Sequence, residues 1–153
     1  KTLNLGVGEK KKHTKIYYSN QTSNVGASIY KDNNKKLISE KIMIDKIDNI
    51  LSKMKEKNFV IKIDIEGNEI NALNGAKKIL KKNCLIIYED HASDKFHLNS
   101  KYLLKKNFSI FYFDGKKIYQ IKKINELNDI KKLKHKGYNF IATRSLLFKK
   151  NLY

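Results

Sequence analysis

Residues 59–76 constrain the fold of this chain more than any other segment. Residues 59–65 are β-branched and mostly apolar, which predicts a buried strand. Apolar residues at helical spacing follow and predict a helix over about 68–82. Two carboxylates, Asp64 and Glu66, fall at the junction beside Gly67. Ligands of open α/β sheets bind outside the carboxyl ends of strands, so this junction is the first candidate site.

The remaining apolar pattern predicts a mixed α/β fold. Strands are predicted at 2–7, 14–18, 84–89, 108–113, 117–121 and 138–143, with a short one around 27–30 and an extension of the last at 146–148. Helices are predicted after Asp45 as N-cap to about 57, at 95–106 and at 125–135. Asp114-Gly115 marks a hairpin. This order predicts a parallel α/β sheet with an antiparallel edge hairpin, in a single domain over 1–153.

The charge of the chain favours no specific nucleic-acid partner. The formal net charge is +18, but only Arg144 among the 33 basic residues is an arginine. Specific readers of bases and phosphates rely on the bidentate guanidinium, so we expect only weak, salt-sensitive attraction to polyanions. No run approaches the roughly 18 apolar residues of a membrane span, and no signal-peptide pattern opens the chain. The sequence therefore predicts no transmembrane segment and a cytoplasmic location.

Three further side chains and one short run are open to more than one interpretation. Cys84 is the single cysteine and lies in an apolar strand pattern, so we expect a buried thiol and no disulfide. His97 lies among polar and basic residues and is predicted to face solvent. Glu69 is predicted to serve the helix dipole or to face solvent. The run 89–91 contains two carboxylates and a histidine, but its side chains should diverge, so no metal site is predicted.

Residues 61–69, with Leu73, Gly75 and Ala76 behind them, resemble the signature of FkbM-type methyltransferases. Residues 44–50 resemble the helix start that precedes this signature in the family. Residues 86–91 resemble the family's next strand, and 138–142 its closing strand. The resemblance covers about 1–148 and implies the C-terminal half of a Rossmann-like class I methyltransferase sheet.

The resemblance also implies an activity and a set of site residues. The activity is transfer of a methyl group from S-adenosyl-L-methionine to a hydroxyl of a sugar, glycolipid or secondary metabolite, with a small-molecule or glycan acceptor as partner. The implied residues are Asp64, Glu66, His91 and Glu89 for catalysis, Asp64, Gly6 and Val7 for the cofactor, and Glu66, Gly67 and Asn68 for the substrate, without a metal.

The family's main cofactor-binding elements cannot be placed in this sequence. Residues 3–9 superficially resemble the glycine-rich loop but lack a third glycine and an acidic residue before Gly6. Only 56 residues separate Gly8 from Asp64 (64 − 8), too few for the missing strands and helices. We therefore expect a partial methyltransferase domain, inactive alone. The alternative is a noncatalytic α/β binding module with lysine-driven affinity for polyanions.

Overall fold

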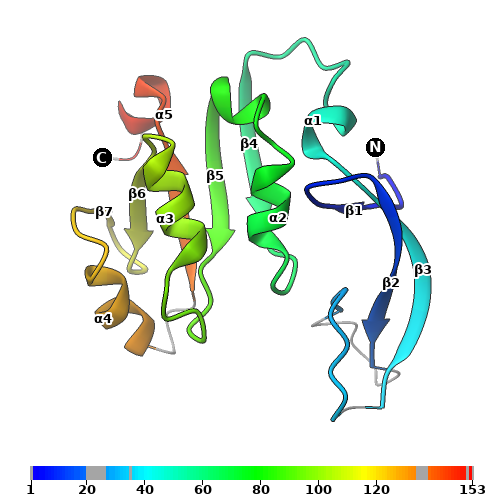
Figure 1. Ribbon diagram of the computed structural model, residues 1–153. Helices are drawn as coiled ribbons and strands as arrows, with labels where there is room; N and C mark the ends of the chain where they lie inside the picture. The colour runs from blue at the N-terminus through cyan, green and yellow to red at the C-terminus, as the bar shows by residue number, and fades with distance from the viewer. Residues whose placement is uncertain (1, 20–26, 35, 134–137, 151, 153) are drawn as a thin grey trace. The chain divides into compact units, whose positions relative to one another are not determined.

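The computed structural model describes residues 2–19, 27–34, 36–133, 138–150 and 152. The chain forms two compact units (Figure 1). The hairpin unit comprises Lys1–Met54 and Ile65–Ile79, and the sheet unit comprises Lys55–Asp64 and Leu80–Tyr153. One domain over 1–153 stays a prediction.

The hairpin unit contains a three-stranded sheet and two short helices. Its elements are β1 (Gly6–Val7), β2 (Lys12–Tyr18), β3 (Ile38–Asp45), α1 (Ile47–Ile50) and α2 (Glu69–Asn74). The strand order is β1-β3-β2, with β1 parallel and β2 antiparallel to β3. β2 and β3 pair continuously from Lys12↔Ile44 to Tyr18↔Ile38 and form a long curved ribbon (Figure 1).

Several expectations for the hairpin unit are wrong in extent. β3 spans eight residues for which no strand was predicted, because its first four residues are exposed and show no alternation. β1 covers only the end of the predicted strand 2–7, and 27–30 forms an isolated bridge from Ser28 to Tyr17. α1 is a single turn, and Lys46 rather than Asp45 is its N-cap. α2 ends at Asn74, and a 3₁₀ turn follows at Ile79–Lys81.

The sheet unit is a five-stranded sheet with three helices. Its strands are β4 (Asn58–Ile63), β5 (Asn83–Glu89), β6 (Ser109–Phe113), β7 (Ile118–Ile121) and β8 (Asn139–Thr143). Its helices are α3 (Leu98–Lys105), α4 (Glu126–Lys132) and α5 (Leu146–Lys150). The strand order is β4-β5-β8-β6-β7. The predicted mixed α/β class and the edge hairpin β6–β7 are confirmed.

The sheet differs from the predicted one in its proportion of parallel strands. Only β4 and β5 pair in parallel, because β8 enters antiparallel between β5 and β6. Residues 146–148 lie in α5 and do not extend β8, and 134–135 of the predicted fourth helix lie outside the described residues. The Asp114-Gly115 turn forms as predicted, with Gly115 at φ +99° and Asp114 N–H donating to the Lys117 carbonyl at 3.1 Å.

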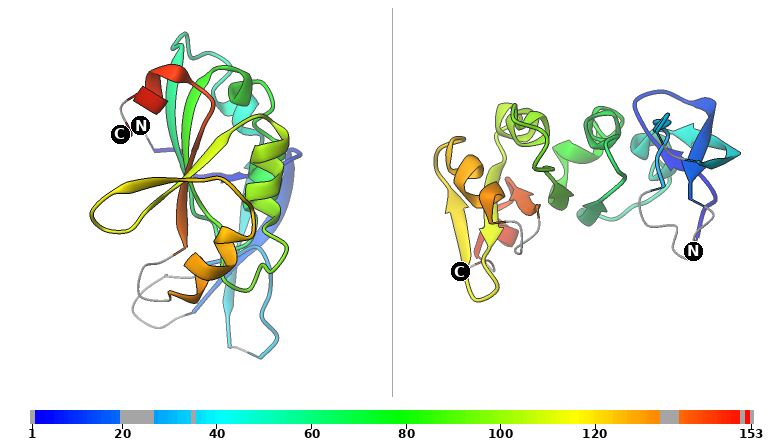
Figure 2. Two further views of the ribbon diagram at one scale, coloured as in Figure 1. Left: turned by 90° about the vertical axis from the view of Figure 1, so that its left-hand side faces the viewer. Right: turned by 90° about the horizontal axis from the view of Figure 1, so that it is seen from below.

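The core of the sheet unit lies on both faces of its sheet. α3 packs against β6 and α5 against β5, and the two helices lie on opposite sides of the strands (Figure 2). Fully buried side chains come from the inner strands, among them Cys84, Ile86, Tyr88, Ile110, Phe111 and Phe140. The buried position predicted for Cys84 is confirmed. In the ranges described above, no helix has the length and apolar character needed to cross a membrane.

Candidate functional site

Asp64 follows directly after the last residue of β4 and belongs to the sheet unit. Its side chain is about one-third exposed, and its Oδ2 accepts a hydrogen bond from Lys62 Nζ at 2.7 Å. Lys62 is itself largely exposed, so this is a surface ion pair, which contributes little stability. The Asp64 carboxylate therefore lies exposed at the carboxyl end of the strand, and its role in binding or catalysis stays a prediction.

Glu66 and Gly67 form a tight turn at the start of the hairpin unit's second segment. Glu66 has φ +53° and Gly67 has φ +97°, and such values are unfavourable for a residue with a side chain. Glu66 occupies this conformation with an exposed carboxylate, while its carbonyl accepts a hydrogen bond from Ser28 Oγ at 3.0 Å. Backbone strain of this kind clusters at functional sites, which favours the predicted role of Glu66.

Glu69 holds this turn in place; it lies in the first turn of α2, as the helix-dipole alternative predicted, and not in solvent. The residue is only 5% exposed, and its Oε1 accepts the N–H groups of Ile65 at 3.0 Å and Gly67 at 3.2 Å. Two charge-assisted bonds to backbone amides fix the turn that presents Glu66. This role of Glu69 could have been predicted from the sequence, because a carboxylate lies close to a glycine turn whose N–H groups need acceptors.

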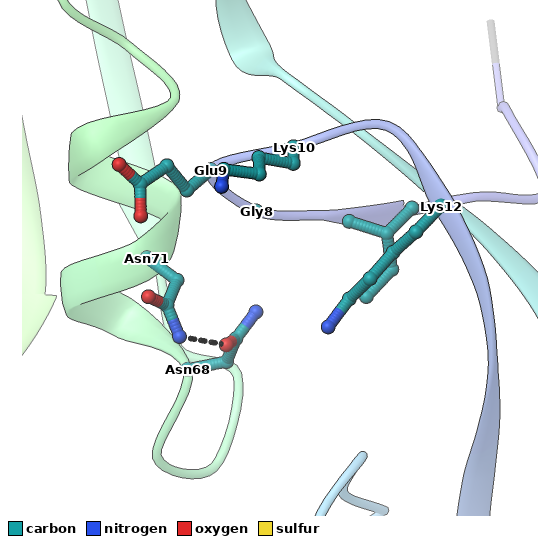
Figure 3. A pocket seen from close by; sticks show the side chains of 7 residues that line it. Gly8, Glu9, Lys10, Lys12, Asn68 and Asn71 are labelled. Carbon is teal, nitrogen blue, oxygen red and sulfur yellow. Dashed lines mark hydrogen bonds between the residues drawn. The ribbon is translucent and has the colours of Figure 1, made fainter.

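Asn68 joins the predicted substrate and cofactor segments within the hairpin unit. Its Nδ2 donates to the Val7 carbonyl at 2.8 Å, and its Oδ1 accepts from Asn71 Nδ2 at 2.8 Å (Figure 3). Beside it lies a pocket of about 210 Å³, lined by Gly8, Glu9, Lys10, Lys12, Ile44, Asn68 and Asn71. Asn68 is among the residues predicted from the sequence, whereas Lys10, Lys12 and Asn71 are not.

The predicted cofactor residues Gly6 and Val7 lie near this pocket in the chain but do not line it. Gly6 pairs with Ile44 in the sheet, and a Cβ at Gly6 would approach Ile42 and Ile44 side-chain carbons at 3.2 Å. The Val7 carbonyl is taken by Asn68. The packing of the sheet therefore accounts for a glycine at position 6, and both cofactor assignments stay predictions.

Gly75 and Asp48 lie in the segments that resemble the FkbM-type signature, and both residues stabilise the fold. A Cβ at Gly75 would lie 2.1 Å from the Gly8 carbonyl oxygen, so only glycine permits α2 to approach this backbone. Asp48 accepts backbone N–H groups of Lys78 and Ile79 at 2.9 to 3.0 Å. Asp48 N–H in turn donates to the Gly75 carbonyl at 3.0 Å. These contacts tie α1 to the chain that leaves α2.

The side chains at the end of β5 diverge as expected. Asp90 is fully buried, whereas His91 is exposed and Glu89 is half-buried. His91 Nδ1 accepts the Ser93 N–H at 3.1 Å and lies 2.7 Å from Ser93 Oγ. An imidazole that accepts at Nδ1 carries its proton on Nε2 when neutral. His91 must therefore release Ser93 before it can accept a proton.

Asp90 anchors a buried polar network beneath this strand end. Lys131 Nζ donates to Asp90 Oδ1, to the His91 carbonyl at 3.0 Å and to the Asp94 carbonyl at 2.9 Å, which uses all three ammonium protons. Ser100 donates to Asp90 from its hydroxyl and its amide, and Tyr88 hydroxyl lies 2.7 Å from Ser100 Oγ. Burial raises the pKa of Tyr88 well above its usual range.

His97 is also part of this network and is not solvated as predicted. It is only 3% exposed, its Nε2 lies 2.9 Å from Asn128 Oδ1, and its Nδ1 lies 3.8 Å from Asp90 Oδ1. Polar neighbours in the sequence concealed its position because the partners come from α4 and the end of β5. A smaller pocket of about 140 Å³ lies beside it, lined by Ala92, Asp94, Lys95, His97, Asn128, Lys131 and Lys132.

Within the described ranges, no three His, Cys, Asp or Glu side chains come together in a way that could hold a metal ion. The Cys84 thiol lies apart from these polar groups in the core, and its burial raises its pKa to about 11.

The comparison with protein families gives one match. The model of the methyltransferase FkbM domain matches residues 2–140, which includes the strand ends, the turn and the pocket described above. No curated protein and no solved structure matches the chain. The match agrees with the resemblance of residues 61–76 and extends over most of the sequence. The chain therefore belongs to the FkbM methyltransferase family.

Proposed function

We propose that this chain carries the acceptor side of an S-adenosylmethionine-dependent O-methyltransferase that acts on a hydroxyl of a sugar, glycolipid or secondary metabolite. The observation that carries the proposal is the family match over residues 2–140. The parallel pair β4–β5, followed by antiparallel strands to the edge, supports a sheet like the closing half of the class I methyltransferase fold.

The chemistry requires an oriented hydroxyl and a group that accepts its proton as the new carbon–oxygen bond forms. Asp64 and Glu66 have exposed carboxylates that no backbone donor of the described residues occupies, in contrast to Glu69. His91 is a weaker candidate because its Nδ1 lone pair is already used by Ser93. We therefore assign proton acceptance to Asp64 or Glu66. Glu89 and His91, at the end of the neighbouring strand, are the weaker candidates for the same role.

When bound, S-adenosylmethionine supplies the electrophilic methyl group. The pocket of about 210 Å³ fits only a part of such a molecule, because ligand sites usually measure about 300 to 1,000 Å³. Its carboxylate, amide and ammonium groups suit a polar end of the cofactor or a polar acceptor. Gly67 and Asn68 would hold the acceptor through the turn that Glu69 fixes.

The first test is binding of S-adenosylmethionine, measured by calorimetry on this chain and on any longer reading frame that contains it. Binding by at least one form is expected, with methyl transfer from labelled cofactor to a panel of sugars, glycolipids and hydroxylated metabolites. Absence of cofactor binding in every form would contradict the enzyme proposal and favour the noncatalytic module.

The second test separates the Asp64 carboxylate from its ion pair. In the form that turns over, Asp64→Asn should lower kcat by roughly 100-fold or more, the usual contribution of a general base. Lys62→Met is the matched control because it breaks the same ion pair and keeps the carboxylate, so its kcat should stay near the starting value. Equal rates in the two variants would remove Asp64 from the catalytic set. Glu66→Gln is then compared in the same way.

A further inference from the structure

The carboxylates of the hairpin unit are largely occupied by donors other than lysine. Tyr18 hydroxyl donates to Glu40, Lys46 N–H and Asn49 Nδ2 donate to Asp45, and backbone amides occupy Asp48 and Glu69. The hydrogen bond from Asn49, together with that from the Lys46 amide, lowers the pKa of Asp45. Negative charge in this unit is thus committed to holding the fold, and few carboxylates are left for its many lysines.

Lys10 and Lys12 illustrate this imbalance at the pocket. Both are exposed, both line the pocket, and neither forms an ion pair within the part of the chain that the structure describes. The one carboxylate of the lining is Glu9. Two ammonium groups therefore face one carboxylate, and the pocket has an excess of positive charge.

Two side-chain amides and a small backbone complete the lining. The amides bond mainly to Val7, Tyr30 and each other, so the lysines are the charged donors of the pocket. Figure 3 shows the Lys12 side chain reaching into the space opposite Asn68 and Asn71, while Glu9 lies on the α2 side. Gly8 adds no side chain, and a Cβ there would lie 2.9 Å from Ile44 Cγ2. The volume of about 210 Å³ suits one charged group with a single ring. Ammonium donors beside such a volume are the partners of a carboxylate or phosphate oxygen.

We infer that this pocket is a subsite for an oxyanion group, a carboxylate or a phosphate, carried by the acceptor. Its assignment to the acceptor rests on the methyl-transfer proposal, whereas the binding of the anion does not. The acceptor class narrows accordingly to acidic or phosphorylated hydroxyl compounds. A negatively charged acceptor also benefits from attraction to a chain of net charge +18 as it approaches.

The sequence offers a matched control for the general attraction of lysines to anions. Lys15 lies on β2 as Lys12 does, is exposed, and does not line the pocket. Their odd separation places the two side chains on opposite faces of the strand. Lys12→Met and Lys15→Met therefore have the same net charge and differ in the pocket alone.

Binding is measured by NMR titration of the chain with glucose 6-phosphate, glucuronate and neutral glucose at fixed ionic strength. Both anions should shift the amides of residues 8–12 and 68–71 and bind more tightly than glucose. Lys12→Met should weaken anion binding about tenfold, as loss of one hydrogen bond to a charged group implies, and Lys15→Met less than twofold. Equal losses in the two variants, or binding of glucose as tight as that of the anions, would overturn the inference.

A cofactor carboxylate is the other source of the same chemistry. Titration of S-adenosylmethionine into Lys12→Met distinguishes the two, because a pocket for the acceptor leaves the cofactor's affinity unchanged. A loss for the cofactor without a loss for the sugar anions would overturn the assignment to the acceptor. Anion binding in a chain that never binds S-adenosylmethionine would refute methyl transfer and leave the subsite in place, so the two failures are distinguishable.

Discussion

The two units are held together by different means. In the hairpin unit β2 has no buried residue and β3 has one, Ile44. Its turns and helices are fixed by side-chain bonds to backbone groups, from Asp48, Asn68 and Glu69. In the sheet unit alternate residues of β5 are buried, and the buried polar network of Asp90 begins at the residue that follows the strand. The buried apolar residues of the hairpin unit come mainly from its helical segments, among them Ile47, Leu73 and Ile79. The comparison shows that the β2–β3 ribbon depends on backbone pairing and polar contacts, whereas the strands of the sheet unit build an apolar core.

The largest loss of unfolding free energy is expected at the buried ion pair of Asp90 and Lys131 in the sheet unit. Lys131→Met would leave the fully buried Asp90 carboxylate without its cation, which costs about 3 to 5 kcal/mol of unfolding free energy. Asp90→Asn/Lys131→Met removes both charges and should restore more than half of that loss. Denaturant unfolding of the four species gives the coupling energy. Additive losses would mean that the pair is not a unit.

Gly75→Ala tests the close backbone approach in the hairpin unit. The residue has φ −80°, which alanine tolerates, so the expected loss of about 1 to 3 kcal/mol comes from overlap with the Gly8 carbonyl alone. Gly115→Ala in the sheet unit is the contrasting variant, since its Cβ meets open space and only its φ of +99° is unfavourable. Hydrogen exchange should report loss of protection in residues 6–8 and 69–76 for Gly75→Ala. Equal protection in both variants would contradict the packing argument.

Cys84 gives the sheet unit a dependence on alkaline pH. Its pKa is about 11 in the folded chain against an ordinary value of 9.0, so the unfolded chain loses the thiol proton first as pH rises. The contribution of the Cys84 thiol to the free energy of unfolding is fully present below pH 9 and is lost as the pH rises towards 11. At pH 10 the wild type should lose about 1 kcal/mol more than Cys84→Ala, relative to pH 8. Identical pH profiles of unfolding would contradict a buried thiol.

The smallest effect on stability is expected at the proposed catalytic carboxylate. Asp64→Asn breaks only an exposed ion pair with Lys62, so unfolding free energy should change by less than about 0.5 kcal/mol. A loss of several kcal/mol in thermal or denaturant unfolding would show that Asp64 holds the fold as Glu69 and Asp48 do. Asp64 would then belong with the residues that stabilise the fold.

Most of the sheet unit could be predicted because burial leaves a period in the sequence. β5 follows its predicted range within one residue, and the hairpin at Asp114-Gly115 forms where its turn residues indicate. The position of β8 between β5 and β6 could not be read from local pattern, because strand order depends on pairing between distant segments. β3 was missed for the opposite reason, since an exposed strand that relies on backbone pairing has no apolar alternation.

The candidate site was predictable in type more than in role. Asp64 and Glu66 are exposed, and their roles in the site stay predictions. Residue type alone could not separate the roles of Glu66 and Glu69, because both are carboxylates near the same glycine. Only Glu69 is buried and accepts two backbone N–H groups. The partners of His97 and Lys131 lie on other elements, so local composition suggested solvent where the fold supplies a polar interior.

The central position of β8 has a consequence for synthesis of the chain. β8 is the last strand of the sheet unit in the sequence and the middle strand of its sheet, with Leu85 opposite Thr143. Until a ribosome has released these residues, the strand that joins β5 to β6 is missing, and the edges of both strands leave backbone N–H and C=O groups unpaired. Nascent strands with such open edges fold slowly and invite association with other chains. Completion of the sheet is thus a late event, and chaperone protection matters most for the growing chain before residue 139.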